Sequence, residues 1–108
     1  MTSFEFGDVI LVPFPFTDQS SSKQRPAVVV STAEYSRSRG DILIAAITSQ
    51  IGGDFRVSDW KAAGLVKPSV FKPVIATIAD SLVIRRLGSL SEADATELRK
   101  MLRALFLG

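Results

Sequence analysis

The chain has 108 residues and a mass of 11.7 kDa, which corresponds to one compact domain over residues 1–108 and not to two. Hydrophobic residues make up 46% of it and both histidine and cysteine are absent, so we expect a real core and exclude zinc fingers, cysteine–histidine hydrolases, histidine-pair ribonucleases and disulfide scaffolds. The formal net charge is +2 and the pI about 9.3, a slight preference for anionic partners.

The first half of the chain predicts three strands. Short runs of apolar and β-branched residues, bounded by Gly, Pro, Ser and Asp, occupy Asp8–Phe14, Pro26–Ser31 and Asp41–Thr48. Both faces of each run are apolar, which is typical of strands at the centre of a small barrel or beneath a subunit interface. Two polar loops, residues 17–25 and 50–56, bring hydroxyl, amide and cationic groups to the strand ends.

Shorter strands are expected in the second half. The candidates are Arg56–Ser58, Ser69–Phe71, Val74–Ala79 and Leu82–Ile84. Pro73 separates the second from the third, because proline cannot donate to a strand ladder. A mainly β fold in the form of a small barrel is the economical packing for so many short strands.

The C-terminal segment predicts a helix that begins after Ser91. Ser91 and Asp94 form a Ser-x-x-Asp variant of the capping box, which also accounts for the acidic pair Glu92 and Asp94. Lys100 and Arg103 lie toward the other end, as the helix dipole favours. One apolar stripe at helical spacing contains Leu98, Met101, Leu102 and Leu105. We interpret this stripe as a core or dimer contact.

Charge is unevenly distributed along the chain. Residues 56–86 contain six Lys or Arg and two acids, whereas residues 1–55 contain four and six. The basic segment predicts either solvated strand edges or a surface that follows phosphates. The aspartates stand singly, so we expect neither a metal ion nor a cofactor. The apolar runs are shorter than the ~20 residues of a membrane span and the N-terminus is acidic, unlike a signal peptide, so we expect a cytoplasmic protein.

Several ordered runs carry a resemblance to a known family. GDVILVPFPFTD (residues 7–18) and KQRPAVVVS (residues 23–31) closely resemble the MazF/PemK family, the toxins of type II toxin–antitoxin systems. AAITS (residues 45–49), GLVKPS (residues 64–69) and LVIRRLGSLS (residues 82–91) follow in the order and at the spacing of that family. The resemblance therefore covers nearly the whole chain.

This resemblance implies an SH3-like small β-barrel with a C-terminal α-helix, and a homodimer. It also implies a metal-independent endoribonuclease that cleaves single-stranded RNA within a short sequence, with a cognate antitoxin protein as partner. In the family, the Arg of the Arg-Pro step and the Thr of the third strand form the recurrent catalytic pair. They correspond to Arg25 and Thr48 in this chain.

The chemistry of RNA cleavage agrees with that pair. Without a metal, the neighbouring 2′-OH attacks the phosphorus, so the site needs a proton acceptor, a proton donor and a group that stabilises the phosphorane. The planar, charged guanidinium of Arg25 can hold two phosphate oxygens, and the Thr48 hydroxyl can donate to the same oxygens or orient the 2′-OH. A guanidinium is a poor base, so Asp18 is the candidate auxiliary base, and the identity of the proton acceptor stays open.

Further RNA contacts are expected from both polar loops and from the 64–69 run: Phe16, Thr17, Lys23, Gln24, Ser49, Gln50, Lys67 and Ser69. Trp60 is expected either at a surface for RNA or antitoxin, or as a lid on the barrel.

Two other functions stay open. One is a non-catalytic toxin that grips a topoisomerase through its C-terminal end, Leu105–Gly108, and the other is an RNA-binding barrel without nuclease activity.

Overall fold

The computed structural model describes residues 3–13, 24–49, 52–53 and 55–107 of the chain. The elements in this part are, in chain order, β1 (Asp8–Pro13), β2 (Gln24–Val29), α1 (Ala33–Arg37), β3 (Asp41–Thr48), β4 (Arg56–Val57), β5 (Ser69–Ala79), the 3-10 helix η1 (Asp80–Leu82), β6 (Arg85–Ser89) and α2 (Glu92–Phe106).

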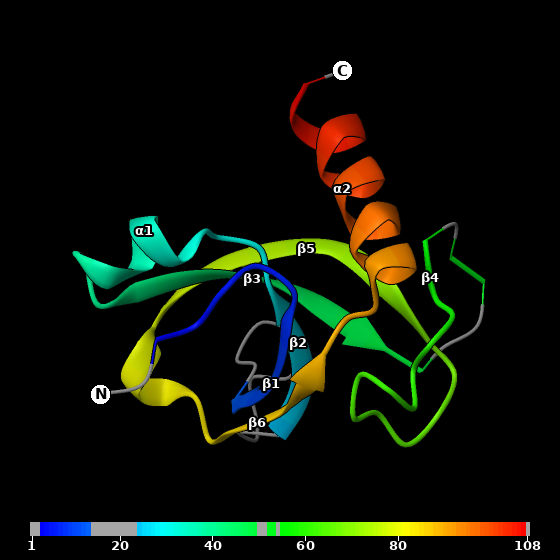
Figure 1. Ribbon diagram of the computed structural model, residues 1–108, viewed down its shortest axis with the longest axis horizontal. Helices are drawn as coiled ribbons and strands as arrows, with labels where there is room; N and C mark the ends of the chain where they lie inside the picture. The colour runs from blue at the N-terminus through cyan, green and yellow to red at the C-terminus, as the bar shows by residue number, and fades with distance from the viewer. Residues whose placement is uncertain (1–2, 14–23, 50–51, 54, 108) are drawn as a thin grey trace.

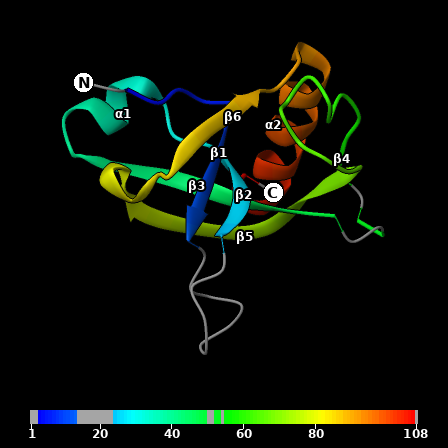
Figure 2. The same cartoon turned by 90° about the horizontal axis from the view of Figure 1, so that it is seen from below.

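The described strands form one antiparallel sheet in the order β4-β5-β3-β2-β1-β6. The sheet curls into a half-barrel, with the long strand β5 arching across it and α2 rising from one side (Figures 1 and 2). β4 and β6 are its edges and, within the described ranges, do not pair with each other. The expected mainly β fold with a C-terminal helix is confirmed, in the form of a half-barrel.

The sheet has an apolar core on each face, which explains why β2 and β3 lack polar alternation. Val29 and Ile44 belong to one buried cluster, whereas their neighbours Val28 and Ala45 belong to another. Successive strand residues point to opposite faces, so each of these side chains meets a core. The second cluster is covered by α2, which contributes the fully buried Leu98.

β3 has the predicted bounds, and β2 begins two residues before its predicted start. The prediction of two strands at residues 69–71 and 74–79 is wrong, because β5 is a single strand that passes through Pro73. Ala45 of β3 pairs with Ile75 of β5, and Ile47 pairs with Phe71. Between these two pairs β5 runs four residues against two of β3, which makes a bulge in β5. Pro73 is exposed and lies within this bulge, where the pairing with β3 does not need a backbone N–H donor.

The prediction of a strand at Leu82–Ile84 is also wrong. Leu82 closes the turn of η1, and the next strand, β6, begins only at Arg85. α1 has no counterpart among the elements predicted from the sequence. It begins at Thr32, whose Oγ1 accepts a hydrogen bond of 3.1 Å from the backbone N–H of Tyr35. Both elements are a single turn long, too short for a hydrophobic period to mark them.

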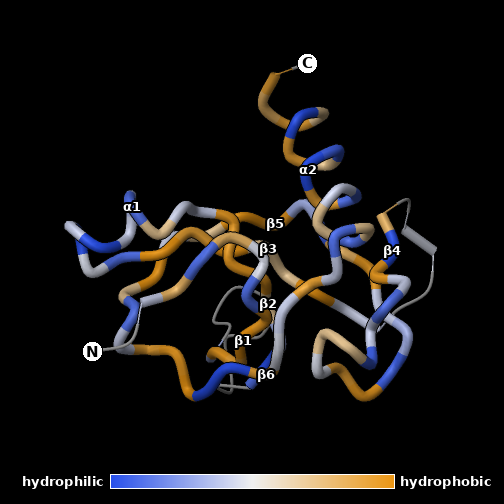
Figure 3. Tube along the Cα trace, viewed as in Figure 1, coloured by the Kyte–Doolittle hydropathy of each residue, from blue (hydrophilic) through white to orange (hydrophobic). Residues whose placement is uncertain are grey.

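α2 begins where the sequence predicts, because Ser91 Oγ accepts a hydrogen bond of 3.2 Å from the backbone N–H of Asp94. Its apolar stripe divides along the helix. Leu98 and Met101 are fully buried, so the core interpretation is confirmed for this half, whereas Leu105 is 44% exposed. The apolar C-terminal end projects away from the sheet (Figures 1 and 3). No helix in the described ranges is long and apolar enough to cross a membrane.

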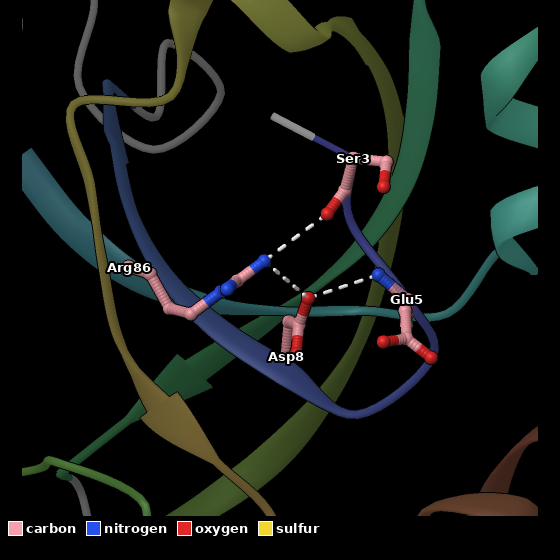
Figure 4. Close-up of polar contacts among 4 residues, drawn as sticks. All are labelled: Ser3, Glu5, Asp8 and Arg86. Atoms are coloured by element: carbon pink, nitrogen blue, oxygen red, sulfur yellow. Dashed lines mark hydrogen bonds and ion pairs between the residues drawn. The ribbon is translucent and has the colours of Figure 1, made fainter. Parts of the chain in front are cut away.

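One polar cluster holds the N-terminal segment against the edge strand β6 (Figure 4). Arg86 Nη2 donates to the Ser3 carbonyl at 3.1 Å and forms an ion pair with Asp8 Oδ2 at 3.0 Å. The same carboxylate oxygen accepts the backbone N–H of Glu5 at 2.9 Å, and the Arg86 guanidinium lies 5.4 Å from the centre of the Phe4 ring. Arg86 therefore has a structural role, and its charge is partly neutralised by Asp8.

Candidate active site

A pocket of about 240 Å³ opens where β2 begins and β3 ends. Three segments that are distant in the sequence form its lining. The described lining residues are Gln24, Arg25, Pro26, Ile47, Thr48, Ser49, Leu65, Val66, Lys67 and Ser69. Their polar groups are a guanidinium, an ammonium, an amide and hydroxyls, so the lining supplies mainly hydrogen-bond donors and positive charge.

Strand register brings the two predicted catalytic residues together. Ala27 pairs with Ala46 at the last pair of β2 and β3, and Arg25 and Thr48 each lie two residues beyond it on their own strand. Both residues line the same pocket. Arg25 is held on its other side by pairing with Val12 of β1.

Arg25 has an unsatisfied donor at the base of its guanidinium. The residue is half-buried, and its Nε is a buried atom with no hydrogen-bond acceptor among the described residues. A buried donor without a partner costs about 1–3 kcal/mol, and more when the group is charged. The outer nitrogens of a guanidinium can hold two anionic oxygens at once.

Thr48 is half-buried at the last position of β3, where it pairs with Val70 of β5. Ser49 follows it and is exposed, and Gln24 is exposed at the first position of β2. These three residues therefore line the pocket together with Arg25, from the ends of two adjacent strands.

The third side of the pocket is formed by Leu65, Val66 and Lys67. They belong to residues 58–68, here named the wall loop, which joins β4 to β5. Lys67 is exposed near its end, and the loop is continued by Ser69, whose Oγ donates to the Lys67 carbonyl at 2.9 Å. Within the loop the backbone N–H of Leu65 donates to the Trp60 carbonyl at 2.9 Å. Trp60 is partly buried and packs on the second core cluster, so it covers the barrel as the lid interpretation expects.

The wall loop also closes the gap between the two sheet edges (Figure 2). Gly64 has φ +83°, and a Cβ at this position would lie 2.0 Å from the carbonyl oxygen of Leu87 in β6. A Cβ at Gly88 would likewise lie 2.6 Å from the Ala63 carbonyl oxygen. The loop and β6 thus touch backbone to backbone, and glycine is needed at both points of contact.

Asp94 anchors the start of the wall loop, which corrects the interpretation of this acid as a helix-capping residue alone. Its side chain is buried with 1% exposure. Oδ1 accepts the backbone N–H of Ser58 and Oδ2 that of Asp59, each at 2.8 Å. Such charge-assisted bonds are about twice as strong as neutral ones, so α2 holds this side of the pocket in place.

The predicted site residues divide into two groups. Those that the pocket brings together are Arg25, Thr48, Gln24, Ser49, Lys67 and Ser69. Those that lie outside the described residues are Phe16, Thr17, Asp18, Lys23 and Gln50. The apolar lining residues Pro26, Ile47, Leu65 and Val66 were not predicted as site residues. All four lie in runs that resemble the family, namely KQRPAVVVS, AAITS and GLVKPS, and this was the available signal.

The basic segment does not form one free cationic surface. Lys67 lines the pocket, but Arg86 is paired with Asp8, and Lys61 Nζ lies 5.5 Å from the centre of the Trp60 ring. Arg56, Lys72 and Arg85 are exposed, and the interpretation of this segment as a surface that follows phosphates stays a prediction. Within the described ranges, no group of three or more Asp or Glu side chains is close enough to hold a metal ion.

Comparison with known families follows the whole length of the fold. A family model described as PemK-like, MazF-like toxin of type II toxin–antitoxin system matches residues 5–106. The comparison with curated proteins gave no match.

Among solved structures, the chain is similar to MazF from Deinococcus radiodurans, with 23% identity and a TM-score of 0.78 over 100% of both chains. It is similar to the Mycobacterium tuberculosis toxin MazF-mt6, with 22% identity and a TM-score of 0.73 over 92% of this chain and 95% of that one. A mycobacterial endoribonuclease solved in complex with its cognate antitoxin has 16% identity and a TM-score of 0.69, over 96% of this chain and 93% of that one. These likenesses establish a shared fold.

Proposed function

Because the chain belongs to the family of PemK-like, MazF-like toxins of type II toxin–antitoxin systems, we propose that it is a sequence-specific, metal-independent endoribonuclease that cleaves single-stranded RNA. The observation that carries this proposal is the pocket that Arg25 shares with Thr48 and Lys67. A guanidinium in such a pocket is suited to a phosphate, and the described part of the lining holds no cluster of carboxylates like those that bind Mg²⁺ in metal-dependent nucleases.

The proposed reaction is an internal transfer at phosphorus. The 2′ oxygen attacks the adjacent phosphorus and its proton leaves to a base, while the bond to the 5′ oxygen breaks and that oxygen takes up a proton. The products are a 2′,3′-cyclic phosphate and a 5′-hydroxyl. Arg25 stabilises the negative charge that builds up on the non-bridging oxygens, and Thr48 donates to the same oxygens or orients the 2′-OH. Asp18 is the candidate base, and it lies outside the described residues.

A cognate antitoxin and a second copy of the chain are the proposed protein partners. The mycobacterial endoribonuclease with the same fold was solved with its cognate antitoxin, which supports the first. The exposed apolar end of α2, with Phe106 at 65% and Leu107 at 77% exposure, supports a protein contact there. Cellular RNA as substrate implies that the protein acts in the cytoplasm.

The test is RNA cleavage by the purified protein in EDTA. The wild-type chain is expected to cleave at defined sites and to leave cyclic phosphate ends. Arg25→Ala is expected to lower kcat by about 10²–10³-fold, the usual effect of removing one charge-stabilising donor, and Thr48→Ala to lower it by a smaller factor. Arg37→Ala and Thr77→Ala replace the same residue types at exposed positions outside the pocket lining and serve as matched controls. Full activity of both pocket variants would refute the assignment.

A second candidate function rests on the same exposed end of α2. A toxin that grips a topoisomerase without catalysis would use Leu105, Phe106 and Leu107, all of which are exposed. Deletion of residues 105–108 and Arg25→Ala separate the two functions in a growth assay. Toxicity that survives Arg25→Ala but is lost on the deletion would favour the topoisomerase function over RNA cleavage.

A further inference from the structure

Val66 is the most exposed large hydrophobic side chain in the described part of the chain, at 87%, and it lines the pocket that contains Arg25. A single exposed apolar residue needs no explanation by itself. Val66 differs because of its place, between the buried Leu65 and the exposed Lys67, at the mouth of a pocket whose other exposed groups are polar.

The wall loop holds Val66 at a fixed position. The loop is tied at its start by the carboxylate of Asp94 and in its middle by the contact of Gly64 with the β6 backbone. Just beyond Val66, the Ser69 hydroxyl fixes the Lys67 carbonyl at 2.9 Å. Three anchors on both sides of one exposed valine make a preorganised surface, which is how a rigid scaffold presents a binding residue.

The pocket lining combines polar and apolar side chains. The strand ends supply Arg25, Thr48 and Ser49 beside Pro26 and Ile47, and the wall loop supplies Leu65 and Val66 beside Lys67. A nucleotide likewise combines an anionic phosphate with the apolar face of a base. A volume of about 240 Å³ is below the ~300–1,000 Å³ of pockets that enclose drug-sized ligands, so it suits one base at a time.

We propose that Val66 is a specificity-determining residue, whose side chain packs against the base next to the phosphate held by Arg25. This inference rests on the proposed RNA cleavage. The contact forms in the ground state as well as in the transition state, so it contributes to substrate binding and to the choice of cleavage site and not to the chemical step. Unstacked bases of single-stranded RNA are available for such contact.

The experiment uses a labelled single-stranded RNA that contains every pentanucleotide, and then a short RNA around the site that the wild-type chain cleaves. Val66→Ala is expected to raise KM on the short RNA by about tenfold, with kcat within about twofold, and to relax the choice of site on the long RNA. Val66→Ile keeps a branched apolar side chain and is expected to retain both KM and site choice. Because Val66 is exposed, the melting temperature of each variant is expected to match that of the wild type.

Leu82→Ala is the matched control, since Leu82 is 50% exposed and is not part of the pocket lining. If the wild type cleaves RNA and Val66→Ala leaves KM and the cleavage sites unchanged, Val66 has no role in specificity while the proposed function stands. If Val66→Ala lowers kcat with KM unchanged, the residue acts on the chemical step and the inference is overturned. If the wild type cleaves no RNA, the proposed function fails, and this inference fails with it.

Discussion

Replacing the buried carboxylate of Asp94 tests how the pocket wall is held. Asp94→Ala removes two hydrogen bonds of 2.8 Å to the amides of Ser58 and Asp59. Hydrogen bonds to a charged group contribute about 1.5–3 kcal/mol each. Ser58 and Asp59 are exposed, so water replaces part of each bond and the lower end of that range applies. The expected loss in the free energy of unfolding is therefore about 3 kcal/mol in total.

The assay is urea unfolding followed by circular dichroism, with thermal melting as a second measurement. A loss of about 3 kcal/mol lowers the melting temperature of a domain of this size by roughly 12 °C or more. Asp94→Asn keeps the shape and one acceptor oxygen but sets its Nδ2–H₂ donor against the other backbone N–H, so it is expected to recover less than half of the stability. Glu97→Ala is the control on the same helix, because its exposed ion pair with Lys100 is expected to contribute less than about 1 kcal/mol. Equal stability of Asp94→Ala and Glu97→Ala would refute the anchoring role.

Two further predictions concern the backbone contact and the pH response. Gly64→Ala is expected to lower the free energy of unfolding more than Gly40→Ala in the same assay. Both glycines have positive φ, but only at Gly64 would the new Cβ meet another backbone, at 2.0 Å from the Leu87 oxygen. Equal losses for the two variants would show that the φ angle alone decides. The value of kcat/KM for RNA cleavage is expected to stay constant between about pH 6 and 7. The reason is that the chain has no histidine and that ordinary carboxyl groups titrate near ~4. A clear inflection of kcat/KM in that interval would contradict the roles proposed for Arg25, Thr48 and Asp18.

The main strands could be predicted because their residues carry a strong local signal. β3 is a run of apolar and β-branched residues between Gly40 and Ser49, and it has the predicted bounds. The errors arise where tertiary contacts decide. Pro73 marks a strand end in most sequences, but here a bulge absorbs it, and a bulge depends on the partner strand. The apolar run at residues 82–84 favours a strand locally, but Leu82 ends η1 and the strand begins only at Arg85.

The candidate site was predictable only in part from the sequence. Family resemblance pointed to Arg25 and Thr48, and the strand register then explains how residues 23 positions apart meet. The role of Asp94 was hidden, because an acid near the start of a helix has a sufficient local explanation as a cap. Val66 was hidden for the opposite reason, since an apolar residue in a mainly apolar chain gives no sign that it is exposed.

The bond from α2 to the wall loop has a consequence for the synthesis of the protein. The ribosome adds about 5–20 residues per second, and α2 is made after every residue that lines the pocket. Until Asp94 has emerged and docked, the amides of Ser58 and Asp59 lack their acceptor and the wall of the pocket is not held. The last segment to be synthesised therefore completes the support of a pocket that is built entirely from earlier segments.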